Sequence, residues 1–266
     1  MARLRMSTLH VVRMGQIGDI LITEPVTRAL KPHFSRAVLY TRYPDAGRLL
    51  EIYDEVLPYE LKPSEVTRPG DAIFHPLYEI FPGVNHFDGY AQSAGIAPPP
   101  FPSADRLPRV KGGWPRLREG RYGLIAPETS SWMRDMRQWP RENFESLKNR
   151  LEASLGFPFV MLGAAHSFAD MLSLIEHCAI FLGNDSAPAI LAQAWRRPSF
   201  VICGSTRPER VLLDPLAVGI THEVGCNGCK DFARHTDIGC ASPICLTDLA
   251  VEKVHAVIMG KFSVTK

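Results

Sequence analysis

Short apolar runs alternate with amphipathic or turn-forming segments along the whole chain. Eight of these runs have the length and composition of buried strands: one begins near Leu9, and the others span 37–40, 55–58, 71–74, 122–126, 159–162, 179–182 and 200–203. Strands that alternate with helical patterns are typical of α/β folds with parallel sheets. The pattern therefore predicts an α/β protein.

Helical periodicity is clearest after residue 139. Pro140 suits the first turn of a helix, and Phe144, Leu147 and Leu151 then recur at three- and four-residue spacing. We expect this helix to pack one face on a sheet. A last helix is expected to begin at Thr247 and to pack back onto a domain.

A proline-rich stretch divides the chain into two parts. Prolines crowd residues 98–102, and Lys-Gly-Gly follows at 111–113, a composition that blocks regular structure and is typical of a linker. We therefore predict two Rossmann-like domains, 1–110 and 111–266. The second would include the cysteine motif described below.

Two neighbouring strands of the second domain end in small polar residues. Gly183, Asp185 and Ser186 follow one strand, and Gly-Ser-Thr at 204–206 follows the next. Such turns place free backbone N–H groups and a helix N-terminus at one sheet edge, where a phosphate can bind. The alternative is that Asp185 and Ser186 only cap the following helix.

A similar turn follows the first strand. Gly15, Gly18 and Asp19 lie between that strand and an apolar helical pattern. Their spacing is not the dinucleotide fingerprint, and a glycine turn alone is a weak motif. Asp19 nevertheless stands where a side chain would point into a cleft.

Composition excludes several classes of protein. The chain has 266 residues, 45% of them hydrophobic and 22% charged, as expected of a globular protein. A net charge of +2 gives no reason to expect a nucleic-acid partner. No run is apolar enough to span a bilayer, and the basic first residues precede no apolar stretch, so we expect a cytoplasmic protein.

Six cysteines add a separate signal. Cys178 and Cys203 lie in apolar surroundings and are expected to be buried thiols. The other four have the spacing C-x2-C-x10-C-x4-C, at Cys226, Cys229, Cys240 and Cys245. In a cytoplasmic chain this spacing favours a structural tetrahedral thiolate site for zinc or iron. Reduced structural thiols or disulfides are the alternative, and His235 could replace one ligand.

The chain resembles glycosyltransferase family 9, the ADP-heptose heptosyltransferases of lipopolysaccharide core assembly and their autotransporter-modifying relatives. Four segments carry the likeness in order: Gly18-Asp19-Ile20-Leu21 through Lys31, Arg137-Gln138-Trp139-Pro140 through Phe144, Gly183-Asn184-Asp185-Ser186, and Gly204-Ser205-Thr206 with Pro208. The resemblance implies a GT-B architecture, in which two Rossmann-like domains, the first on the acceptor side, face one cleft. A cysteine-rich C-terminal segment also occurs in this family, and in its autotransporter-modifying branch it binds iron.

The resemblance also implies roles for individual residues. Asp19 would be the general base of an inverting transfer, and Arg137, where the family usually has lysine, would offset charge on the departing diphosphate. A solvated surface charge is the alternative for Arg137. The residues implied in binding the nucleotide sugar are Gly18, Ser130, Asp185, Ser186, Ala187, Ser205 and Thr206. The implied donor is ADP-heptose, and the implied acceptor is a glycolipid or a protein. A glycolipid acceptor would allow peripheral contact with the inner membrane.

Several positions depart from the family pattern. Ala187 replaces a glycine, Pro188 removes a backbone donor, and Ile190 replaces a histidine. Between Gly163 and Phe168 the chain is too short for the helix and strand that usually carry an acidic contact to the donor's ribose. A non-catalytic relative that binds a nucleotide or a partner, with a structural metal site, is therefore the alternative function.

Overall fold

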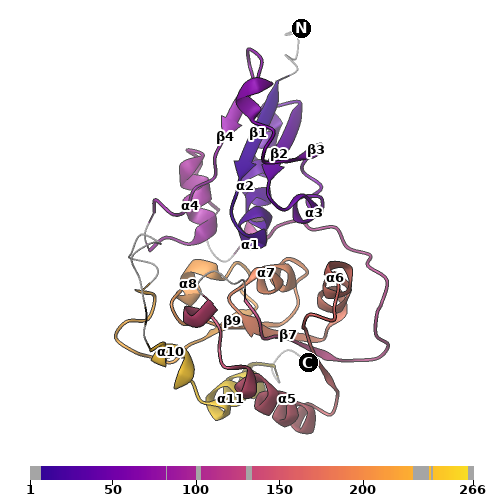
Figure 1. Ribbon diagram of the computed structural model, residues 1–266, viewed down its shortest axis with the longest axis vertical. Coiled ribbons are helices and arrows are strands. Elements are labelled where there is room, and N and C mark those ends of the chain that lie inside the picture. The colour runs from indigo at the N-terminus through magenta and orange to yellow at the C-terminus, as the bar shows by residue number, and fades with distance from the viewer. Residues whose placement is uncertain are drawn as a thin grey trace. The chain divides into compact units, whose positions relative to one another are not determined.

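A computed structural model describes residues 7–81, 83–99, 103–129, 134–229, 240 and 242–262. The chain divides into two compact units, Met1–Lys111 and Gly112–Lys266. Each unit is built on a parallel sheet whose strands are connected by helices (Figure 1). The predicted α/β fold with parallel sheets is confirmed.

The first unit has a four-stranded sheet in the order β3-β2-β1-β4. Its elements are β1 (Thr8–Arg13), α1 (Ile17–Leu21), α2 (Thr23–Leu30), η1 (Lys31–His33), β2 (Arg36–Thr41), α3 (Pro44–Gly47), β3 (Glu55–Pro58), η2 (Pro63–Glu65), β4 (Ala72–Phe74), α4 (His86–Ser93) and η3 (Ala104–Arg106). β1 is buried along almost its whole length and pairs in parallel with both β2 and β4. The segments that follow β1 and β4 therefore leave the same edge of the sheet side by side.

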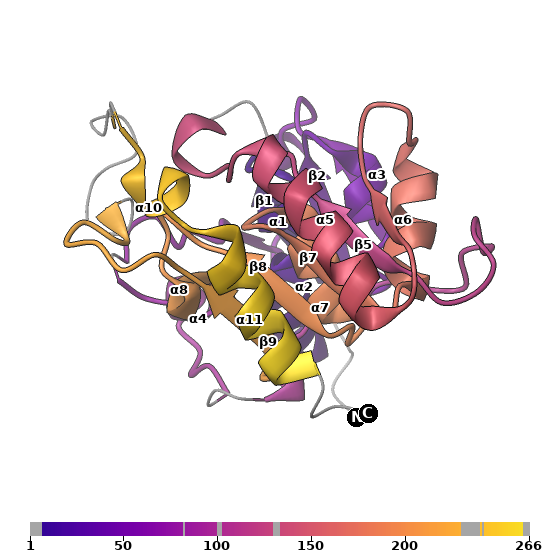
Figure 2. The same ribbon diagram turned by 90° about the horizontal axis from the view of Figure 1, so that it is seen from below.

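The second unit has a five-stranded sheet in the order β6-β5-β7-β8-β9. Its elements are β5 (Gly123–Ala126), η4 (Arg134–Met136), α5 (Arg141–Leu155), β6 (Phe159–Met161), α6 (Phe168–His177), β7 (Ile180–Asn184), α7 (Ala187–Ala194), β8 (Ser199–Ile202), α8 (Pro208–Val211), β9 (Ala217–Ile220), α10 (Ile244–Thr247) and α11 (Val251–Phe262). α5 and α11 lie side by side on one face of the sheet (Figure 2), and α6 and α7 cover the other (Figure 1). β7 occupies the centre, so the turn after it lies between its neighbours' turns.

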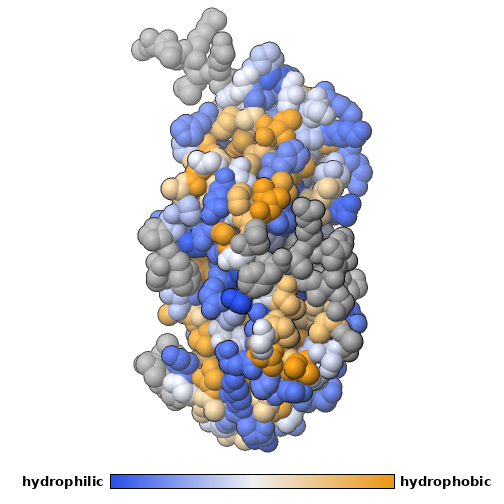
Figure 3. Space-filling model, turned by 90° about the vertical axis from the view of Figure 1, so that its left-hand side faces the viewer, coloured by the Kyte–Doolittle hydropathy of each residue, from blue (hydrophilic) through white to orange (hydrophobic). Residues whose placement is uncertain are grey.

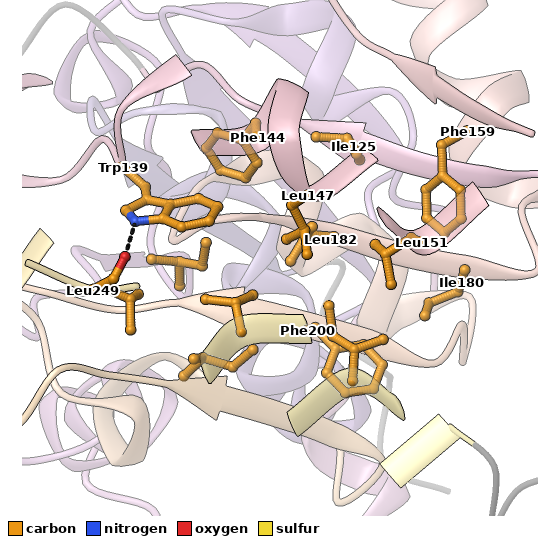
Figure 4. Packing of buried hydrophobic residues seen from close by; sticks show 14 of the residues in the cluster. Ile125, Trp139, Phe144, Leu147, Leu151, Phe159, Ile180, Leu182, Phe200 and Leu249 are labelled. Carbon is orange, nitrogen blue, oxygen red and sulfur yellow. Dashed lines mark hydrogen bonds between the residues drawn. The ribbon is translucent and has the colours of Figure 1, made fainter. Parts of the chain in front are cut away.

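The core of the second unit confirms the predicted packing of α5. Phe144, Leu147 and Leu151 are fully buried against the sheet, in one cluster with residues of β5, β7 and β8 (Figure 4). Trp139 precedes α5 and is also fully buried, and its indole N–H donates a hydrogen bond of 3.0 Å to the Leu249 carbonyl. This bond fixes the segment before α5 to the segment before α11.

The prediction that the last helix begins at Thr247 is wrong. Thr247 ends the short helix α10, and the long helix α11 begins only at Val251. The intervening Leu249 is buried and uses its carbonyl for the Trp139 indole. A tertiary hydrogen bond thus holds the segment between the two helices, and the local sequence does not reveal it.

In the described part of the chain, no helix combines the length and apolar character needed to cross a membrane. On the face drawn in Figure 3, hydrophobic residues form small patches among hydrophilic ones.

Candidate active site

Asp19 lies in the tight connection between β1 and α1. Its Oδ2 accepts a hydrogen bond of 2.7 Å from the backbone N–H of Gln16, which fixes the side chain against the start of the helix. A Cβ atom at Gly15 would lie only 2.3 Å from that same oxygen. The Asp19 position therefore requires glycine at residue 15. Gly18 precedes Asp19 within α1.

The surroundings of Asp19 combine one cation with two phenols. Arg13 Nη2 lies 3.6 Å from Asp19 Oδ1, and the Tyr90 hydroxyl donates to the Asp19 carbonyl at 3.2 Å. Burial and, after it, the negative charge of Asp19 raise the pKa of both Tyr78 and Tyr90. The Asp19 side chain keeps 16% of its surface exposed, so it is not sealed from solvent.

Asn184 lies at the edge of the second sheet where the parallel strands end. It ends β7 with no exposed surface, and its amide bonds in two directions. Nδ2 donates to the Pro127 carbonyl at 2.7 Å, and Oδ1 accepts from the Trp139 backbone N–H at 2.9 Å. Asn184 thus connects the segments after β5 and before α5. The sequence analysis did not assign it a role.

Arg137 lies two residues before Trp139, whose backbone N–H donates to Asn184. Its Nη2 donates to the Asp185 carbonyl and lies 3.3 Å from Asp185 Oδ2, and both side chains are 13% exposed. Arg137 is therefore a paired, largely buried cation, and the alternative of a solvated surface charge is wrong. The pair holds the guanidinium beside the turn that leads into α7.

The N-terminus of α7 has no side-chain cap among the described residues. Ser186 is the N-cap residue, but its hydroxyl donates backwards to the Asn184 carbonyl at 3.1 Å. Ala187 and Pro188 form the start of the helix, and proline contributes no N–H. The capping alternative for Asp185 and Ser186 is therefore not realised. Because Ala189 donates to the Ser186 carbonyl and Pro188 has no N–H, this end offers an anion the helix dipole and the N–H of Ala187.

Ser205 and Thr206 follow β8, the strand beside β7. Both are buried, at 2% and 3% exposure, and neither hydroxyl has a hydrogen-bond partner among the described residues. Thr206 lines a polar cavity of about 300 Å³ together with Gly225 and Asn227, on the side of the cysteine segment. Ser130 lies outside the described residues.

A second cavity, of about 320 Å³, opens beside α7. It is lined by residues that follow β5 and β6 and by the first turns of α6 and α7: Ala126, Pro127, Glu128, Leu162, Gly163, His166, Ser167, Phe168, Met171 and Pro188. Apolar walls with a few polar groups are typical of small-molecule sites. Glu128 brings a carboxylate to this cavity, and the sequence analysis missed it. Its position directly after a buried strand was the available signal.

Three other cysteines of the second unit affect the pKa of Cys245. Cys245 is buried, and burial, followed by the neighbouring Cys226, Cys229 and Cys240, raises the pKa of its thiol to about 11. No three metal-ligating side chains among the described residues are arranged to hold an ion. His235 lies outside the described residues. Cys178 and Cys203 are buried, as predicted.

The fold is shared with known glycosyltransferases. The chain is similar to the iron-containing dodecameric glycosyltransferase TibC from enterotoxigenic E. coli H10407, with a TM-score of 0.74, 17% identity and coverage of 98% of this chain and 77% of that one. It is also similar to E. coli heptosyltransferase WaaC with ADP (TM-score 0.59, 14% identity, 96% and 98% coverage). The third is a family 9 glycosyltransferase from Veillonella parvula DSM 2008 (TM-score 0.68, 11% identity, 98% coverage of both chains). No curated protein matches the sequence.

The shared fold and a family match together support a glycosyltransferase. Residues 148–238 match the model of glycosyltransferase family 9 (heptosyltransferase), and this match confirms the family resemblance read from the sequence.

Proposed function

We propose that the protein is an inverting heptosyltransferase of GT-B architecture, which moves heptose from ADP-heptose to a glycolipid of the lipopolysaccharide core or to a protein. The observation that carries the proposal is Arg137, held beside the uncapped N-terminus of α7 by Asp185. Cations and helix N-termini both bind phosphate groups. The family match supports the choice of a sugar diphosphate.

The proposed reaction is a single displacement. The acceptor hydroxyl attacks the anomeric carbon, its proton passes to Asp19, and the bond from that carbon to the diphosphate oxygen breaks with inversion. The diphosphate leaves with the bonding electrons, and Arg137 offsets its charge.

The donor's nucleoside is assigned to the 320 Å³ cavity beside α7. Its size suits a nucleoside, and Pro188 links it to the proposed diphosphate site. Glu128 is proposed to accept hydrogen bonds from the ribose hydroxyls. It would replace the acidic contact that is lost where the chain is short between Gly163 and Phe168.

The four cysteines of the C-x2-C-x10-C-x4-C motif are proposed to bind zinc or iron. Thiolates suit either metal, and the TibC structure is described as iron-containing. With four protein ligands the metal would be structural and would link Cys226 and Cys229 to Cys240 and Cys245. It takes no part in the proposed transfer, which we place in the cytoplasm.

A turnover assay tests the function. Release of nucleoside diphosphate is measured with ADP-heptose and with other ADP-, GDP- and UDP-sugars, in the presence of core glycolipid or acceptor protein. We expect turnover with ADP-heptose and a loss of roughly 10²–10⁴-fold in Asp19→Ala. Asp45→Ala is the matched control, because Asp45 is an exposed aspartate of the same unit that pairs with its sequence neighbour Arg48. Equal rates in Asp19→Ala and the native protein would contradict the proposal.

A non-catalytic nucleotide-binding or partner-binding relative is the second candidate. Pro188 and Ile190 favour it, because they replace groups at α7 that could otherwise contact the donor. Calorimetry with ADP separates the candidates: binding without turnover of any sugar nucleotide would favour the second.

A further inference from the structure

Arg13 lies at the centre of a buried cluster in the first unit. It ends β1, and its guanidinium lies over the Tyr78 ring at 5.3 Å and over the Tyr90 ring at 5.2 Å. Nη1 donates to the Pro76 carbonyl at 3.0 Å and to Glu79 Oε2 at 3.2 Å, and Nη2 pairs with the other oxygen of Glu79. The segment after β4 and helix α4 thus supply the hydrogen bonds and the aromatic rings that hold the cation.

The same guanidinium faces Asp19. Nη2 lies 3.6 Å from Asp19 Oδ1, and Arg13 is the only cation that pairs with Asp19 in the part of the chain that the structure describes. Burial opposes the charge of Arg13, but the negative charges of Asp19 and Glu79 favour it, and the pKa of Arg13 is raised. Arg13 therefore stays charged at every pH at which the fold persists.

The other groups that face Asp19 carry no positive charge. The hydroxyl of Tyr78 faces the carboxylate, Tyr90 bonds to the Asp19 carbonyl, and burial keeps both phenols protonated at neutral pH. Glu79 adds a second negative charge to the cluster. Without Arg13, the ionised form of Asp19 would keep the hydrogen bond from the Gln16 amide but would face no positive charge among the described residues.

We propose that Arg13 is a positioning residue for Asp19: it keeps the carboxylate ionised without itself donating a hydrogen bond to either carboxylate oxygen. The inference rests on the proposed function, in which Asp19 is the general base. At 3.6 Å the contact is longer than a hydrogen bond, so Arg13 stabilises the charge without occupying Oδ1. Gln16 occupies Oδ2, and Glu79 takes the hydrogen bonds of the guanidinium.

The test compares four variants of the full chain. Arg13→Met removes the cation, Arg13→Lys keeps a charge, and Glu79→Gln removes the competing carboxylate. Arg106→Met is the matched control. Arg106 is also buried in this unit, lies 4.9 Å from the Phe87 ring, donates to the Pro99 carbonyl and pairs with Asp88, but does not pair with Asp19.

Two readouts are needed. The first is the pH profile of kcat/KM with ADP-heptose, whose acid limb reports the ionisation of the base. The second is the titration of ¹³C-labelled aspartate carboxyls by NMR, in which Asp19→Asn identifies the Asp19 signal. The second readout does not depend on turnover, so it still tests Arg13 if the proposed reaction is wrong.

In Arg13→Met we expect the acid limb and the Asp19 titration to move to higher pH by roughly 1 to 3 pH units, because an opposite charge this close has an effect of that size. At a pH within the shifted limb, kcat/KM falls at least about tenfold, and part of the loss is recovered at high pH. Arg13→Lys should restore most of the native profile, and Glu79→Gln should move it to lower pH. Arg106→Met should leave it unchanged.

The proposal is overturned if Arg13→Met folds and lowers kcat/KM equally at all pH values, with the Asp19 titration unmoved. If Arg13→Met does not fold, Arg13→Lys and Glu79→Gln decide, and an unmoved Asp19 titration in Glu79→Gln overturns the proposal. Absence of turnover in the native protein, with a shifted titration in Arg13→Met, would contradict the proposed function and leave the role of Arg13 intact.

Discussion

Gly15 shows how one missing side chain determines the position of a functional group. The Asp19 carboxylate occupies the space into which a Cβ at residue 15 would extend. Asp19 itself bonds to the Gln16 amide, so the turn and the carboxylate form one unit. A methyl group at this position would have to displace either the carboxylate or the backbone.

Gly15→Ala is therefore expected to move Asp19 and to lower kcat at least about tenfold, because a general base must lie within hydrogen-bond reach of the proton it takes. The free energy of unfolding should fall by no more than roughly 1 to 3 kcal/mol, which is the range for an overpacked site. The measurements are kcat and urea unfolding. Gly260→Ala is the control, since its Cβ would meet no atom in the described structure and the change should preserve activity. Native kcat in Gly15→Ala would show that the carboxylate position is unimportant.

Some of these residues could be predicted from the sequence, and others could not. Asp19 could be predicted, because a glycine turn after a buried strand places its side chain at the sheet edge. The pairing of Arg137 with Asp185 could not, because the two residues are 48 positions apart and only the fold brings them together. Asn184 and Glu128 were missed for the same reason, since their bonds and cavity depend on neighbouring strands.

At the scale of elements, Asp71 connects two strands of the first sheet. It precedes β4, and its two oxygens accept hydrogen bonds from the backbone N–H groups of Thr8, at 2.7 Å, and Arg68, at 2.8 Å. These two bonds lower the pKa of Asp71, and His10 lies 3.5 Å away. The carboxylate thus fastens the start of β1 to the turn before β4.

Asp71→Asn should lower the free energy of unfolding at pH 7 by about 1 to 2 kcal/mol, because amide groups would lose charged acceptors. The folded pKa lies below the unfolded value near 4, so the stabilisation is fully present above about pH 5 and is lost as the pH falls through the folded pKa. Urea unfolding at pH 7, 5 and 3 should show the difference from the native protein shrinking only at pH 3. Asp45→Asn, in an exposed local pair, should show little difference throughout. A constant difference from pH 7 to pH 3 would exclude a role for the charge.

Periodicity predicted the elements better than it predicted their ends. Phe144, Leu147 and Leu151 specified α5 because local spacing and burial agree in that helix. The break between Thr247 and Val251 was missed, because it depends on the Trp139 indole, more than a hundred residues away. Local patterns reveal which face of a helix is buried, and distant hydrogen bonds decide where the helix stops.

At the scale of the whole molecule, the chain consists of two units, each with its own sheet. The four cysteines of the C-x2-C-x10-C-x4-C motif all belong to the second unit and lie in the chain between β9 and α11. A metal bound there would join two segments that precede α11, a helix packed on α5. Its contribution to stability should therefore be confined to the second unit.

Metal removal tests this arrangement. A ligand present at 100 times its Kd stabilises the folded state by about 2.7 kcal/mol, which corresponds to a decrease in Tm of about 5 to 10 °C on its removal from a unit of this size. We expect a chelator to lower the Tm of the second unit by that amount and to leave the first unit unchanged, as measured by calorimetry. Elemental analysis should find one zinc or iron per chain, and Cys245→Ser should abolish it. Cys178→Ala is the control, because Cys178 is a buried thiol of the same unit and should leave the metal content unchanged. A native protein without metal, or a chelator effect on both units alike, would contradict a structural metal site in the second unit.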